Sequence, residues 1–125
     1  MSYSVRPGAP ETVGHSPFAA GTAVLVTLHS PREKFWGVLL ELTVAGVSVR
    51  GIDLNSFDDF TGMVRAGEPA SPTTAFFPLA RVERVELDTA NGTIPSLSER
   101  FAEITGRLAL RFLMPSEFPV EDAAG

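Results

Sequence analysis

The alternation of apolar and polar residues predicts three consecutive β-strands in the first half of the chain. In the first of them, Val24, Val26 and Leu28 share one face. The short turn at Ala45-Gly46 joins the second strand to the third as an antiparallel hairpin. The predicted strands are 22–29, 34–44 and 47–54.

The second predicted strand is apolar on both faces, so we expect it to be buried on both sides for much of its length. One face carries Trp36, Val38, Leu40 and Leu42, and the other carries Phe35, Gly37, Leu39 and Glu41. Gly37 inside the strand predicts a bend or a close approach of another backbone. A barrel interior can hold only one of these faces. The other needs cover either from the same chain or from a neighbouring subunit, and the sequence favours neither.

The second half of the chain predicts a pair of strands followed by a helix. The segment 75–87 is typical of two strands separated by a break near Pro78, after a Gly/Pro/Ser/Thr-rich linker at 66–74. Between the third strand and this linker, three-residue apolar spacings at 55–65 indicate a single helical turn or a packed loop.

Ser96 and Glu99 have the spacing of a capping box, which predicts a helix that begins at this point. An apolar stripe of helical period follows, at Leu97, Phe101, Ile104 and Leu108. If Gly106 ends the helix, Leu108 leaves the stripe. The sequence does not decide whether 108–114 continues the helix or forms another element.

Together these patterns predict a mainly β fold: a small, strongly bent antiparallel β-barrel with a C-terminal helix. The expected organisation is a flexible N-terminal arm, the barrel domain, a helical segment packed on the barrel, and a tail. Their expected bounds are 1–20, 21–88, 89–114 and 115–125.

Composition limits the cellular compartments and the classes of binding partner that we expect for this protein. The net charge is −5, and Lys34 is the one lysine among ten basic residues, which disfavours nucleic acid as a partner. The chain has no cysteine and its first residues do not resemble a signal peptide. The longest apolar region, 35–49, is shorter than the roughly 20 residues of a membrane-spanning helix. We therefore expect a cytoplasmic protein without a membrane partner.

Residues 22–88 resemble the Sm-like/Hfq-like small β-barrel family. The resemblance is carried by three segments: Val24-Leu25-Val26-Thr27-Leu28, the F-x-G-x-L pattern of Phe35-Trp36-Gly37-Val38-Leu39, and the corner in Phe77-Pro78-Leu79-Ala80-Arg81-Val82-Glu83-Arg84-Val85. In that family, edge strands of neighbouring subunits pair to close a ring, and the rings commonly bind RNA. The resemblance thus implies a homo-oligomer.

Departures from the family pattern concern the RNA site. The turn at 43–46 lacks the aspartate and asparagine of the family's base-binding turn, and Pro78-Leu79-Ala80 stands where Hfq proteins carry a lysine-histidine pair. The predicted helix also follows the barrel, whereas the family usually places its helix before it. The resemblance therefore carries over the fold and not the RNA-binding residues.

No motif points to catalytic, cofactor-binding or metal-binding residues. His15 and His29 lack metal-ligand spacing, and we expect them at the surface or as caps. Asp53, Asp58 and Asp59 form the densest acidic group, which we interpret as solvated turn or capping residues rather than as a cation site. We expect no cofactor, and no small-molecule substrate is indicated.

The leading hypothesis is a non-enzymatic binding or scaffold module that self-associates through strand edges and apolar faces. Its candidate interface residues are Phe35, Trp36, Phe76, Phe77, Leu97, Phe101 and Ile104. The alternative is an RNA- or single-strand-binding protein with an arginine patch drawn from Arg50, Arg65, Arg81 and Arg84. An enzyme of unknown type ranks third, and it requires a deep pocket with convergent polar groups.

Overall fold

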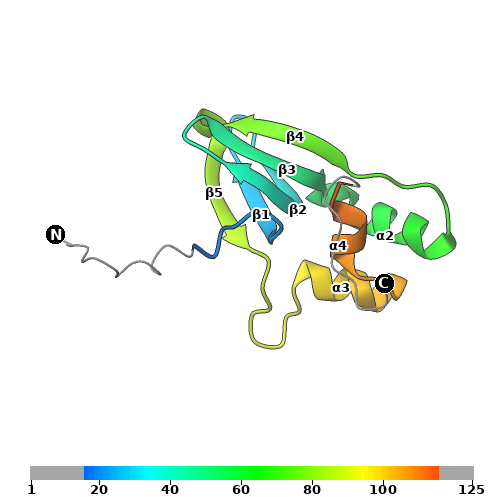
Figure 1. Cartoon of the computed structure of the whole chain (residues 1–125). Coiled ribbons are helices and arrows are strands. Elements are labelled where there is room, and N and C mark those ends of the chain that lie inside the picture. Colours follow the sequence, from blue (N-terminus) through cyan, green and yellow to red (C-terminus); the bar gives the residue numbers. More distant parts are fainter. Residues whose placement is uncertain (1–15, 116–125) are drawn as a thin grey trace.

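The computed structural model of the chain describes residues 16–115. Five strands form one antiparallel sheet in the order β4-β3-β2-β1-β5 (Figure 1). The strands are β1 (Ala23–Leu28), β2 (Glu33–Leu42), β3 (Gly46–Asp53), β4 (Thr73–Pro78) and β5 (Val82–Leu87). The helical elements are η1 (Leu54–Ser56), α2 (Phe57–Ala66), η2 (Leu79–Arg81), α3 (Leu97–Thr105) and α4 (Ala109–Leu113).

The prediction of a mainly β, antiparallel fold is confirmed. Each of the first three strands lies within two residues of its predicted bounds, and the strand pair around Pro78 is present with η2 as its corner. Strands β4 and β5 lie at opposite ends of the strand order and do not pair with each other, so the sheet is open. The predictions for the arm up to residue 15, for His15 and for the tail from residue 116 lie outside the described residues.

Two glycines face each other at the centre of the sheet. Gly37 of β2 pairs with Gly51 of β3, and a Cβ atom on Gly51 would overlap the carbonyl oxygen of Trp36. A Cβ atom on Gly37 would likewise overlap the carbonyl oxygen of Arg50. The predicted close backbone approach at Gly37 is therefore confirmed, and both strands need glycine for it.

The segment after β3 differs from its prediction. We expected one helical turn or a loop at 55–65, whereas α2 runs for ten residues and buries Phe57, Phe60, Thr61 and Val64 along one face. Gly67 ends α2 in the left-handed conformation, with φ of 77°. Gly62 lowers the intrinsic helix propensity of this segment. The helix forms because its buried face covers the sheet.

Helix α3 begins as predicted, with both hydrogen bonds of the Ser96–Glu99 capping box present. Gly106 ends it with φ of 73°, so Leu108 leaves the stripe and precedes a separate short helix, α4. Asp88, directly after β5, fixes the start of α3 to the sheet. Its carboxylate accepts hydrogen bonds from the backbone N–H groups of Leu97 and Ser98, from Ser98 Oγ and from Trp36 Nε1, at 2.7–3.0 Å.

The sheet has a hydrophobic core on each face, as the doubly apolar β2 predicted. One core lies beneath the helices and contains Trp36, Val38, Ile52, Phe57, Phe60, Val64, Phe101, Ala109 and Leu113. The other contains Val24, Val26, Leu28, Leu39, Val47 and Val49. In Figure 1 the helices gather beside one part of the sheet. Among residues 16–115 no helix has the length and apolar character needed to cross a membrane.

Candidate self-association surface

The sheet presents two outer strands. Within the described residues, β4 pairs with β3 alone and β5 pairs with β1 alone. The outer side of such a strand carries N–H and C=O groups that another strand can pair with. Figure 1 shows β4 along one border of the sheet and β5 along the other.

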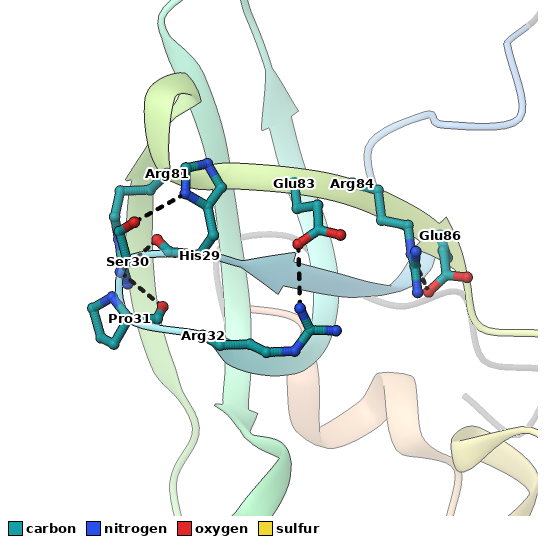
Figure 2. Close-up of polar contacts among 8 residues, drawn as sticks. All are labelled: His29, Ser30, Pro31, Arg32, Arg81, Glu83, Arg84 and Glu86. Carbon is teal, nitrogen blue, oxygen red and sulfur yellow. Dashed lines mark hydrogen bonds and ion pairs between the residues drawn. The ribbon is translucent and has the colours of Figure 1, made fainter.

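The two edge strands differ in charge. The sequence of β4, TTAFFP, contains no ionisable side chain. The sequence of β5, VERVEL, contains Glu83, Arg84 and Glu86. Glu83 pairs with Arg32 at 3.5 Å, and Arg84 pairs with Glu86 at 3.3 Å. Figure 2 shows both ion pairs. Charged side chains on an edge strand oppose pairing with another chain, so β5 is the better protected edge.

Exposed large apolar residues occur where β4 ends beside the β2–β3 turn: Leu42, Val44, Phe76 and Leu79. Val44 is 95% exposed and Phe76 is 52% exposed. Leu79, directly after β4, donates a hydrogen bond from its N to Ala45 O at 2.9 Å, and the Phe76 ring lies against Gly46. Leu42 pairs with Val47 and therefore lies on the face of the sheet opposite to Phe76, so the four residues do not form one patch.

Of the seven predicted interface residues, two are buried within the chain and four more are partly buried. Trp36 and Phe101 are fully buried, with their ring centroids 6.0 Å apart. Leu97 and Ile104 pack against the same core. For these residues the structure shows intramolecular cover, which was one of the two interpretations left open by the sequence.

Phe35, Phe76 and Phe77 have different surroundings. The rings of Phe35 and Phe77 meet edge to face at 5.3 Å, and both pack against the core that lies away from the helices. Phe76, which precedes Phe77 in β4, points to the opposite face and stays half exposed. Among the seven predicted interface residues, Phe76 is the one with a large exposed apolar surface.

Leu42, Val44 and Leu79 were not predicted as interface residues. Leu42 continues the apolar alternation of β2, which is typical of a core position. Val44 lies in a turn, and an isolated exposed valine carries little information. Their position relative to Phe76 depends on the register of β2, β3 and β4, which the sequence pattern does not specify; that register places Leu42 on the face of Phe77 rather than of Phe76.

The four predicted nucleic-acid contacts lie on four different elements: β3, α2, η2 and β5. Three of them already have partners. Arg50 Nη1 donates to Thr74 Oγ1 at 3.2 Å, Arg84 pairs with Glu86, and Arg81 binds the β1–β2 turn. Arg65 is exposed in the last turn of α2. Nucleic-acid binding stays a prediction, to be checked by filter binding to mixed oligonucleotides at low salt.

Arg81 forms the contact that joins η2 to the β1–β2 turn. Its Nη1 donates to the carbonyl oxygens of His29 and Pro31, at 3.0 and 3.1 Å, and its Nη2 pairs with Glu33 Oε1 at 3.0 Å (Figure 2 shows the two carbonyl contacts). In return, His29 N donates to Arg81 O at 3.0 Å. This guanidinium therefore acts as a structural link in the corner that separates the two edge strands.

Two of the three acidic residues predicted as a group have local partners. Asp53 accepts a hydrogen bond from Asn55 N at 2.8 Å, and Asp58 lies 3.7 Å from Arg100. Asp53 and Asp59 border a groove of about 460 Å³ between α2 and the start of β4. Within residues 16–115 no three metal-binding side chains are grouped.

Comparison of the chain with protein-family models, with curated proteins and with solved structures gives no match.

Proposed function

We propose that this protein is a non-enzymatic scaffold or binding module that self-associates through the edge strands of an Sm-like sheet. The observation that carries the proposal is the outer strand β4. Within residues 16–115 this strand is unpaired on one side; it is uncharged and displays the half-exposed ring of Phe76.

Two features of the sheet support the Sm-like interpretation. The glycine pair at Gly37 and Gly51 lets β2 and β3 approach closely at the position where the F-x-G-x-L pattern lies. The corner in 77–85 is formed by η2, which separates two strands that lie at opposite borders of one sheet. A sheet of this kind offers an open edge at each end for contact with further copies.

Burial within the chain also supports a role at the borders of the sheet. Both faces of β2 are covered by side chains of the same chain, including the fully buried Trp36 and Leu39. A partner can therefore reach backbone hydrogen-bonding groups along β4, where pairing gives affinity through the main chain and specificity through side chains such as Phe76.

Sedimentation velocity over a concentration series tests the proposal. We expect the sedimentation coefficient to rise with concentration as copies associate. A sample treated with nuclease serves as the control and should give the same masses, because the proposed contact joins protein to protein. A single monomeric species at the highest concentration that the protein tolerates would refute self-association.

A further inference from the structure

The two borders of the sheet are not equally suited to pairing, and this difference points to a particular arrangement. We infer that a second copy of this chain pairs its own β4 with β4, in antiparallel orientation about a two-fold axis. The inference rests on the proposed self-association and specifies which edges take part. It joins two five-stranded sheets into one continuous sheet, with β5 at both outer borders.

The charge of the strands favours β4 over β5. Within the six residues of β5, Glu83, Arg84 and Glu86 are charged, and β4 has no ionisable side chain to pair with them. Pairing β5 with β4 of another copy would place these three charges beside threonine, alanine and phenylalanine side chains, with loss of hydration and no ionisable partner on β4 itself. Pairing β4 with β4 leaves the charges of β5 in water.

The sequence of β4 also suits antiparallel pairing with itself. Residues directly opposite each other in a sheet share a face, so the two-fold axis passes through Ala75 or through Phe76. In the second register the two Phe76 rings are opposite each other, and in the first they are diagonal neighbours, within reach of aromatic side chains. Either register covers the ring that is 52% exposed in the single chain. Pro78, which lacks an N–H group, lies at the end of the strand, away from the axis.

The positive charge of Arg50, which lies beside β4, makes the proposed dimer contact sensitive to salt. Arg50 of β3 reaches Thr74, with Nη1 3.2 Å from Oγ1, and its buried Nε has no hydrogen-bond partner among the described residues. The guanidinium therefore lies on the face of the sheet that carries Phe76. Its positive charge is repeated in the second copy, so moderate salt should strengthen the dimer by screening the two charges.

Cysteine cross-linking tests the arrangement, and the chain has no native cysteine to interfere. Opposed residues in antiparallel strands have Cα atoms about 4.5–5.5 Å apart, which a disulfide can span. We expect Ala75→Cys or Phe76→Cys to form a covalent dimer on mild oxidation. Glu86→Cys, a half-exposed position on β5, is the matched control and should stay uncrosslinked.

The outcomes separate this inference from the proposed function. A covalent dimer of Ala75→Cys or Phe76→Cys, with a sedimenting mass of two chains, supports β4–β4 pairing. Cross-links that form only in a mixture of Phe76→Cys and Glu86→Cys chains, or a mass above two chains, would overturn β4–β4 pairing and leave self-association intact. A monomer in every sample would overturn both.

Charge substitutions on the two edge strands, made without any cysteine, give an independent measurement of the dimer contact. Phe76→Lys places a charge on the β4 edge and should weaken the dimer at least tenfold, as measured by the concentration dependence of sedimentation. Glu86→Lys, which changes a charge on β5, is the control and should alter the dimer dissociation constant less than twofold. Far-UV circular dichroism establishes that both variants are folded. Equal dimerisation of the two variants would contradict the inference.

Discussion

Gly51 shows how little space the centre of the sheet allows for a side chain. Its Cα faces Gly37 across the β2–β3 pair, and the atoms that a Cβ would meet belong to the backbone of β2. Backbone atoms in a paired strand cannot move aside without breaking ladder hydrogen bonds. Gly62 offers the opposite case, because a Cβ there has no neighbour within 4 Å.

Alanine at these two glycines should therefore have opposite effects on stability. Gly51→Ala should lower the free energy of unfolding by about 3 kcal/mol, at the upper end of the range for overpacking. Gly62→Ala, within α2, should raise it by about 0.5–1 kcal/mol because alanine favours the helix. Urea unfolding followed by circular dichroism measures both. A Gly51→Ala protein as stable as the parent would show that β2 and β3 separate easily at this point.

The strands and helices differ in how far the sequence predicted them. Period-two patterns in β1, β2 and β3 predicted these strands to within two residues, because each pattern is local and each strand has a buried face. Helix α2 was underestimated because Gly62 lowers its intrinsic propensity, while the burial of Phe57, Phe60 and Val64 stabilises it through tertiary packing. The corner at η2 was located by Pro78, but the bond network of Arg81 depends on residues about 50 positions away.

Replacement of Arg81 should loosen the corner between η2 and the β1–β2 turn. Lysine cannot donate from two nitrogen atoms at once, so Arg81→Lys should lose about 1–2 kcal/mol of stability and speed hydrogen exchange at the His29 amide. Arg84→Lys is the control, because its ion pair with Glu86 is exposed and should change stability by less than about 0.5 kcal/mol. Hydrogen exchange measured by NMR distinguishes the two. Equal protection of His29 in both variants would rule out the structural role assigned to Arg81.

At the scale of the whole molecule, the helices and the sheet share one core. Trp36 contacts Phe57 of α2 and Phe101 of α3, with ring centroids 5.3 and 6.0 Å away, and its Nε1 donates to Asp88. The sequence left open whether Trp36 is covered by its own chain or by another subunit, because both alternatives bury the same side chain. The candidate surface at β4 was equally undetermined, since the position of a strand within the strand order is a long-range property.

Removal of the residues after Asp88 should therefore disrupt the sheet domain. The shortened chain lacks Phe101, Ala109 and Leu113, so Trp36 becomes exposed. We expect red-shifted tryptophan emission, binding of a hydrophobic dye and loss of a cooperative thermal transition. A chain that ends at residue 115 keeps all described elements and is the control. Native-like emission from the shorter chain would show that the strands fold without α3 and α4.

Strand β2 contributes Trp36 and Val38 to the core beneath the helices, and Leu39 to the core on the other side. Neighbouring residues of a single backbone thus belong to two separate apolar interiors. Loss of packing in either core displaces β2, and the displacement of β2 weakens the packing of the other core. The molecule should consequently melt as one cooperative unit rather than in two stages, even though its interior is divided by the sheet.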